Sequence, residues 1–284
     1  MMQKGLFGLS VLLLSLLLMP PAQAATISIA GSTTVLKYIQ LAANRYQQLH
    51  PDTHFTISGG GSTNGFAQMA DGRVEIGMMS RDLRANERQV LDAAHVRQVA
   101  VALDAVVPVV SAELYAAGLH SISRQQLADI YRGKLRNWQQ LAGQGWRGPD
   151  RPILVVDKNS YHGTRAVFAD YVLGENRPPN RDVSIVLDGD RDILRLLQSS
   201  DQAIAYVGIA FVSGSMPSLK LRVDGHLIAA SEASIRRGTY PMARRLYLLL
   251  PEHPPAAVAQ FLRFILSREG QALVGQAGYL SLRE

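Results

Sequence analysis

The feature that most constrains this chain is a strand that turns directly into a helix at residues 26–35, Thr-Ile-Ser-Ile-Ala-Gly-Ser-Thr-Thr-Val. Two isoleucines alternate with polar residues, the pattern of a half-buried strand. One glycine then allows a tight turn, and three hydroxyl residues, Ser32, Thr33 and Thr34, begin an amphipathic helix. Free N–H groups and hydroxyls at a helix start suit a bound anion, although the same residues can simply cap the helix.

The chain repeats this arrangement twice. A strand at residues 55–58 runs into a glycine-rich turn, and a strand at residues 152–156 runs into a turn with a lysine and a histidine. The glycine-rich turn is not a nucleotide P-loop, because Phe66 stands where that motif needs lysine. The first of these turns contains Ser62, and the second contains Lys158, His162, Gly163 and Thr164.

Strand patterns alternate with helix patterns throughout the chain, which predicts an α/β fold. The apolar stretch 99–110 is expected to be a long buried strand that crosses between two lobes, and residues 240–250 to be a strand that returns. Ligands of such sheets bind at the carboxyl ends of strands, where the three hydroxyl turns lie.

The first 24 residues have the pattern of a secretory signal peptide. Lys4 precedes an apolar stretch at 6–18, and Ala22-Gln23-Ala24 is a small-residue cleavage site. The apolar stretch is short for a membrane span. The chain has no cysteine, hence no disulfide and no lipid-carrying cysteine. We therefore expect a protein exported to the periplasm and not tethered there.

The net charge of +6 is spread along the chain rather than clustered. Aromatic residues do not alternate with the basic ones, so we expect no nucleic-acid partner. A mild positive charge helps to attract a small anion.

The ordered set of turns resembles the phosphate-binding proteins of ABC uptake systems, the PstS-like family. The resemblance covers nearly all of the chain after residue 24. The motifs that carry it are Gly31-Ser32-Thr33-Thr34, Gly59-Gly60-Gly61-Ser62, Ile76-Gly77-Met78-Met79-Ser80-Arg81, Ile130-Tyr131-Arg132-Gly133-Lys134, Asn137-Trp138, Gly163-Thr164-Arg165, Ile204-Ala205-Tyr206-Val207-Gly208 and Tyr240-Pro241.

The resemblance implies the two-lobed fold of a type II periplasmic binding protein, in which each lobe is a sheet flanked by helices and two crossing strands join the lobes. The crossings fall near Ala105 and Arg244. The expected division is 1–24 for the signal peptide, 25–104 with 245–284 for the first lobe, and 105–244 for the second.

The resemblance also implies the ligand set. Hydroxyl and backbone donors come from the first two turns, and Ser80 and Arg81 belong to the third family loop. The fourth family loop reads Arg, three residues, Ser-Gly-Thr, whereas this chain has Lys158 and His162 at the arginine and serine positions. Ser80 stands where the best-known members place an aspartate that accepts the proton of hydrogen phosphate. The expected set is Ser32, Thr33, Thr34, Ser62, Ser80, Arg81, Lys158, His162, Gly163 and Thr164.

The function expected from the resemblance is capture of inorganic phosphate for the membrane permease of an ABC transporter, by a monomer without metal or cofactor. The three departures at Ser80, Lys158 and His162 leave open a receptor for another oxyanion or a small carboxylate.

A phosphoester hydrolase is the alternative from a different class. Asp157, Ser160 and His162 are residue types of a nucleophilic site, but residues so close in one turn seldom reach triad geometry. Asp188, Asp190 and Asp192 lack the glycine and distal glutamate of a calcium loop. We therefore expect a binding protein and not an enzyme.

Overall fold

The computed structural model describes residues 24–141, 146–212 and 217–282. The expected signal peptide therefore lies outside the described residues, except for Ala24. The strands are β1 (Ala25–Gly31), β2 (Thr53–Gly60), β3 (Ile76–Met79), β4 (Val96–Val110), β5 (Ser121–Ser123), β6 (Leu154–Asp157), β7 (Ser184–Val186), β8 (Ala203–Gly208), β9 (Lys220–Val223), β10 (His226–Ile228) and β11 (Ala243–Pro251).

The α-helices are α2 (Thr33–Leu49), α3 (Ser62–Ala70), α4 (Ala85–Ala93), α5 (Ala112–Ala116), α6 (Arg124–Tyr131), α7 (Gly163–Val172), α8 (Asp190–Gln198), α9 (Glu232–Arg236), α10 (Ala256–Leu266) and α11 (Arg268–Gln276). Two short 3₁₀ helices are η2 (Trp138–Leu141) and η3 (Ile209–Phe211). Within the described ranges, no helix combines the length and apolar character needed to cross a membrane.

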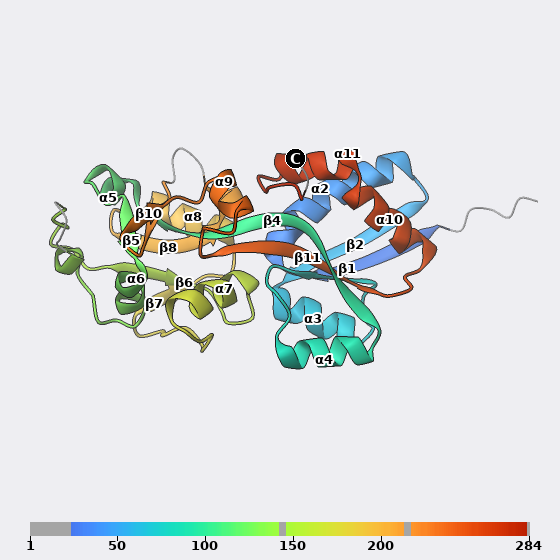
Figure 1. Ribbon diagram of the computed structural model, residues 1–284, viewed down its shortest axis with the longest axis horizontal. Helices are drawn as coiled ribbons and strands as arrows, with labels where there is room; N and C mark the ends of the chain where they lie inside the picture. Colours follow the sequence, from blue (N-terminus) through green and yellow to red (C-terminus); the bar gives the residue numbers. More distant parts are fainter. Residues whose placement is uncertain (1–23, 142–145, 213–216, 283–284) are drawn as a thin grey trace, which may run out of the picture.

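The elements form two lobes joined through β4 and β11 (Figure 1). The first lobe holds β1 to β3 with α2, α3, α4, α10 and α11, and the second holds β5 to β10 with α5 to α9. One mixed sheet runs through both lobes in the order β2-β1-β3-β11-β4-β8-β6-β7, and a smaller sheet has the order β10-β9-β5.

Strand β4 changes its pairing partner part-way along its length. It pairs with β11 as far as Ala105, opposite Ala243, and with β8 from Val106 onward, opposite Gly208. Both pairings are antiparallel. The backbone of one strand therefore belongs to the sheets of both lobes.

The sheet of the first lobe is covered on both faces. Helices α2, α10 and α11 lie on one side and α3 and α4 on the other (Figure 1). Helix α2 turns Val35, Tyr38, Ile39, Ala42 and Tyr46 inward, the i, i+3, i+4 spacing of an amphipathic helix. This packing fixes the N-terminus of α2 at the carboxyl end of β1.

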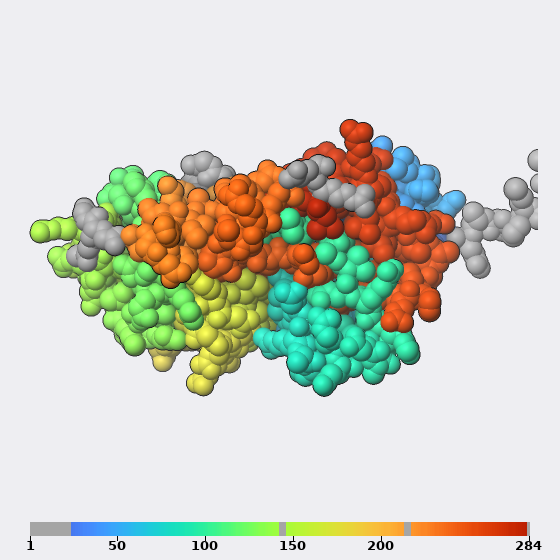
Figure 2. Space-filling view, viewed as in Figure 1, coloured from blue at the N-terminus to red at the C-terminus, as the bar shows by residue number. Residues whose placement is uncertain are grey.

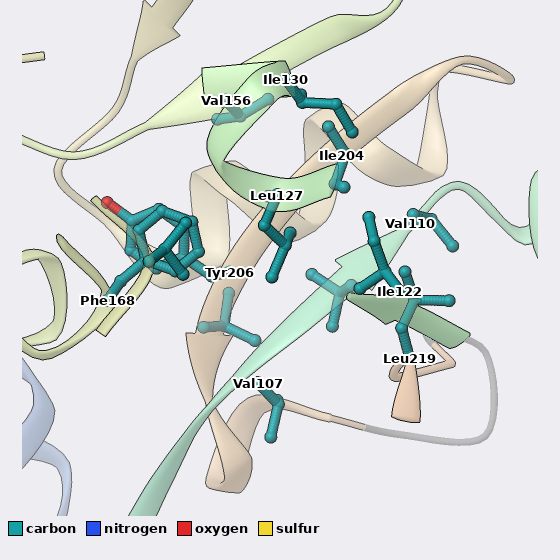
Figure 3. Packing of buried hydrophobic residues seen from close by; sticks show 14 of the residues in the cluster. Val107, Val110, Ile122, Leu127, Ile130, Val156, Phe168, Ile204, Tyr206 and Leu219 are labelled. Atoms are coloured by element: carbon teal, nitrogen blue, oxygen red, sulfur yellow. The ribbon is translucent and has the colours of Figure 1, made fainter. Parts of the chain in front are cut away.

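The second lobe has one core that includes the C-terminal part of β4 (Figure 3). Phe168 of α7 stacks on Tyr206 of β8, with ring centroids 3.9 Å apart and planes 7° apart. Ser123 forms a capping box with Gln126 at the start of α6. The stacked pair holds α7 against the sheet and so fixes the position of the first turn of α7.

Two details differ from the sequence expectations. The returning strand begins at Ala243, not at Tyr240, whose buried hydroxyl donates to the Val106 carbonyl oxygen at 3.2 Å. Helix α8 begins at Asp190, in a segment that the sequence analysis considered only as a metal motif. Its Ile193 and Leu197 are buried, so the segment is a packed amphipathic helix.

Candidate functional site

The three hydroxyl turns of the sequence meet at the boundary between the lobes. Helices α2 and α3 begin in the first lobe after β1 and β2, and α7 begins in the second lobe after β6. The first N–H groups of each helix lack intrahelical acceptors and carry partial positive charge. Thr34 Oγ1 lies 3.1 Å from Thr164 Oγ1, so α2 and α7 touch across the boundary.

Ser62 and Ser80 form a second contact region at the same boundary. Both are fully buried, and the Ser80 backbone N–H donates to Ser62 Oγ at 3.0 Å. A methyl group built on Gly163 would lie 2.3 Å from Ser62 Oγ and 2.5 Å from Ser80 Oγ. Only glycine therefore allows the start of α7 to approach these two hydroxyls so closely.

A buried arginine joins both contact regions. Arg244 donates through Nη1 to Thr164 Oγ1 and to the Ser80 carbonyl oxygen, each at 3.1 Å. Its Nε and Nη2 donate to Asp104 Oδ2 at 2.8 and 2.6 Å. Asp104 also accepts from the Ile209 backbone N–H at 3.1 Å, and burial raises its pKa against the opposing effect of Arg244. Asp104 thus holds the Arg244 guanidinium so that its Nη1 donates to the cluster.

Thr34, Ser62, Ser80, Thr164 and Arg244, with Gly163 against the two serines, form one donor cluster. The hydrogen bonds within it occupy the oxygen atoms of two hydroxyls and leave their protons to be donated. Thr164 Oγ1 accepts from Arg244, and Ser62 Oγ accepts from the Ser80 N–H, so the protons of both hydroxyls remain available to a ligand or a neighbour. Free N–H groups at the start of α7 add further donors. Such an arrangement suits an anion whose oxygens accept several hydrogen bonds at once.

Lys158 and His162 are held by acidic residues near the start of α8. Lys158 Nζ lies 3.2 Å from Asp190 Oδ1, and both side chains are almost fully buried. His162 Nε2 lies 3.0 Å from Asp188 Oδ1. Burial, together with the charge of Lys158, lowers the pKa of His162, although Asp188 opposes the shift.

Arg81 is occupied by a different partner. Its Nη1 and Nη2 lie 2.6 and 2.7 Å from the two carboxylate oxygens of Glu87, in a buried bidentate pair. Glu87 belongs to α4 and also accepts from the Arg84 backbone N–H. The Arg81 guanidinium group, which the family resemblance assigned to the anion, is thus hydrogen-bonded to Glu87 within the first lobe.

Ser32 and Thr33 of the first turn have different roles. Ser32 Oγ accepts from the Val35 backbone N–H at 3.4 Å and caps α2, as the simpler interpretation of the sequence expects. Thr33 is half-buried and lines a crevice of about 400 Å³ between α2 and α8, together with Lys37 and Arg191.

The lobes are in contact in this structure. The Thr63 backbone N–H donates to the Tyr161 carbonyl oxygen at 3.2 Å, and a methyl group built on Gly61 would lie 2.7 Å from the same oxygen. On the face shown in Figure 2, the yellow surface of the second lobe lies against the cyan surface of the first. The donor cluster is therefore enclosed between the lobes.

A family model described as "PBP superfamily domain" matches residues 20–269. The chain belongs to the PBP superfamily. It is similar to the phosphate-binding protein PstS of Bacillus subtilis, with 25% identity over 262 residues, 92% of this chain and 82% of that protein. It is also similar to PstS of Pseudomonas aeruginosa, with 26% identity over 91% of this chain and 84% of the relative.

Solved structures agree with this membership in the PBP superfamily. A putative phosphate ABC transporter substrate-binding protein from Clostridium perfringens, solved with bound phosphate, matches with a TM-score of 0.79 and 28% identity, over 91% of this chain and all of that one. An ABC-type phosphate transport receptor from Vibrio cholerae has a TM-score of 0.72 and 26% identity, over 89% and 99%. The expected two-lobed α/β fold is confirmed.

Sequence reasoning missed Arg244 and Asp104 as members of the cluster in this PBP-superfamily chain. Asp104 interrupts the otherwise apolar stretch 99–110, Arg244 stands beside Arg245 just before the apolar residues 246–250, and Asp104 and Arg244 carry opposite charges. Two such strands that cross between lobes are expected to pair buried charges, so a signal was present. Asp188 and Asp190, the partners of His162 and Lys158, were considered only as metal ligands.

Proposed function

We propose that this chain captures inorganic phosphate between its lobes and delivers it to the permease of an ABC transporter. The observation that carries the proposal is the enclosed donor cluster, in which Gly163 touches Ser62 and Ser80 while Thr34 meets Thr164 beside Arg244. Donors from both lobes then bind one anion, so binding and closure favour each other. The phosphate-binding names of the relatives support phosphate as that anion.

The proposed ligand set follows the cluster. Thr34, Ser62, Ser80, Gly163 and Thr164 supply hydroxyl and backbone donors from the cluster, and Arg244 supplies charge. Thr33 adds a donor from the first turn of α2, beside the cluster. Lys158 contributes charge from its pair with Asp190. Arg81 is left out, because Glu87 occupies its guanidinium group. Ser32 is left out as well, because its hydroxyl caps α2 and its backbone N–H donates to the Met78 carbonyl oxygen at 2.9 Å.

The lobe boundaries and the cellular location belong to the same proposal. Residues 25–104 with 245–284 form the first lobe and 105–244 the second, which the change in pairing of β4 after Ala105 supports. Residues 1–24 direct export, and the rest works as a monomer in the periplasm.

A receptor for another oxyanion or a small carboxylate is the second candidate. Its support is the lysine at the position where the family has arginine, since a lysine charge does not impose the planar two-point grip of a guanidinium. A hydrolase has less support. The relatives are named as binding proteins for transport, and Asp157 pairs with Arg165 at 2.8 Å and with the Tyr206 hydroxyl, not with His162.

Calorimetry on anion-free protein that starts at Ala25 tests the proposal. We expect phosphate to bind with a dissociation constant of about 1 μM or lower, equivalent to about −8 kcal/mol. The double variant Thr33→Ala/Ser62→Ala should bind at least 100-fold more weakly. The matched control Thr56→Ala/Ser58→Ala changes two exposed residues of β2 and should bind as wild type.

Two results would overturn the assignment. A folded protein that binds acetate or another small carboxylate but not phosphate would support the second candidate. Unchanged phosphate affinity in Thr33→Ala/Ser62→Ala would remove the site from the boundary between the lobes.

A further inference from the structure

Asp188 accepts hydrogen bonds from three side chains of the β6–α7 turn. Asn159 Nδ2 and the Tyr161 hydroxyl each donate at 2.7 Å, and His162 Nε2 lies at 3.0 Å. Burial opposes ionisation of the carboxyl group, but these hydrogen bonds outweigh it and lower the pKa of Asp188. Asp188 is therefore a carboxylate at neutral pH.

An ionised carboxylate can only accept hydrogen bonds, so the proton of a neutral His162 must lie on Nε2. The ring is almost fully buried, and burial together with Lys158 lowers its pKa, while Asp188 and Asp190 oppose the shift. His162 is thus neutral near pH 7, and its Nδ1 carries a lone pair.

That lone pair has no acceptor role within the described part of the chain. His162 is the N-cap residue of α7, but its side chain accepts no hydrogen bond from the helix N–H groups. The ring contact with Tyr161, at 4.6 Å between centroids, is tilted and leaves the nitrogens free of that phenol. His162 directly precedes Gly163, which touches Ser62 and Ser80.

The rest of the cluster is rich in donors. The hydroxyls of Ser62 and Thr164 already accept from the protein, and Arg244 only donates. Hydrogen phosphate carries one O–H, which needs an acceptor, whereas sulfate is fully ionised and has only acceptor oxygens. A lone pair beside a bound anion favours hydrogen phosphate, which can donate its O–H to it, and repels sulfate, which cannot.

We propose that His162 Nδ1 accepts the proton of bound hydrogen phosphate, and that Asp188 is the positioning residue that holds the required tautomer. Ser80 has no carboxylate to accept this proton, so the acceptor is His162 of the second lobe. This inference rests on the proposed function, because it assigns the selectivity of the same site.

The test combines ¹⁵N NMR of the His162 ring with calorimetry against phosphate and sulfate at pH 7.5. In wild type, Nδ1 should be unprotonated, and phosphate should bind more tightly than sulfate by a factor on the order of 10⁴, as expected when a polar group loses its partner. His162→Phe should reduce that ratio at least 100-fold. Asp188→Ala should reduce it at least tenfold and produce a signal from the Nδ1–H tautomer.

Tyr161→Phe is the matched control. It removes a different hydrogen bond to Asp188 and keeps the ring that faces Gly61, so both the ratio and the tautomer should stay as in wild type. Sulfate does not change its charge between pH 5 and 8, so any pH dependence of its binding reports on the protein. Sulfate affinity should rise below pH 6.5 in wild type, as His162 gains a second proton, and stay level in His162→Phe.

The two hypotheses, phosphate capture and proton acceptance by His162, fail through different results. Wild type that binds no phosphate overturns the proposed function. Phosphate binding with Nδ1 protonated, or with the same phosphate-to-sulfate ratio in His162→Phe, overturns this inference and leaves the proposed function intact.

Discussion

A methyl group at Gly163 tests whether contact between the lobes creates the anion site. In the structure that methyl would lie 2.3 Å from Ser62 Oγ, 2.5 Å from Ser80 Oγ and 3.2 Å from Ser62 Cβ. Ordinary contacts with a methyl carbon are about 3.5 Å or longer. Gly163→Ala must therefore either hold the lobes apart by about 1 Å or rotate both hydroxyls away from the cluster.

Either response removes the hydroxyls of Ser62 and Ser80 as hydrogen-bond donors to the anion. A hydrogen bond to a charged group contributes about 1.5–3 kcal/mol, so the loss of two costs about 3–6 kcal/mol. The phosphate affinity should accordingly fall by about 10² to 10⁴-fold. The fold itself should be retained, because the Gly163 φ angle is not in the left-handed region and alanine suits the first turn of a helix.

Calorimetry with phosphate measures the loss, and urea unfolding without anion checks the fold. Gly275→Ala is the matched control, since Gly275 lies in α11 with open space around it and should gain up to about 1 kcal/mol of stability without a change in affinity. Phosphate affinity of Gly163→Ala within threefold of wild type would refute the reasoning.

Three further predictions concern buried charges. Arg244→Met leaves Asp104 fully buried and unpaired, so the free energy of unfolding in urea should drop by about 3–5 kcal/mol; a drop below 1 kcal/mol would contradict a buried ion pair. Folding lowers the pKa of His162, so as the pH falls the unfolded chain takes up the His162 proton at a higher pH than the folded chain does. The free energy of unfolding should therefore fall as the pH drops below about 6.5, until the pH is below the pKa of His162 in the folded protein. Urea midpoints at pH 7.5 and 5.5 should differ more in wild type than in His162→Gln, and equal differences would count against the shift. The double variant Arg81→Leu/Glu87→Leu should keep phosphate affinity within threefold by calorimetry, whereas a tenfold loss would return Arg81 to the ligand set.

The sequence predicted the parts of the site that depend on local pattern. A strand, a glycine turn and a hydroxyl before an amphipathic helix lie within about ten residues of one another, so each of the three turns could be identified from its own segment. Contact between Thr34 and Thr164 then follows from the fold, because the carboxyl ends of parallel strands face one boundary.

The parts that it did not predict depend on pairs that are distant in sequence. The contact of Arg244 with Asp104 requires the register of β11 on β4, which no local pattern specifies. Arg81 met the motif but pairs with Glu87, because a buried guanidinium needs a carboxylate and α4 brings one within reach.

The insertion of β11 between β3 and β4 has a consequence for the order in which the chain can fold. Until Ala243–Pro251 has been synthesised, β3 and β4 each lack a neighbour in the sheet of the first lobe. The second lobe needs no residue of this late segment for its own strand pairs, which run from the end of β4 to β10. When the chain emerges in order from its N-terminus, the second lobe can therefore complete its sheet first, while the lobe that begins the chain waits for its last strand, β11.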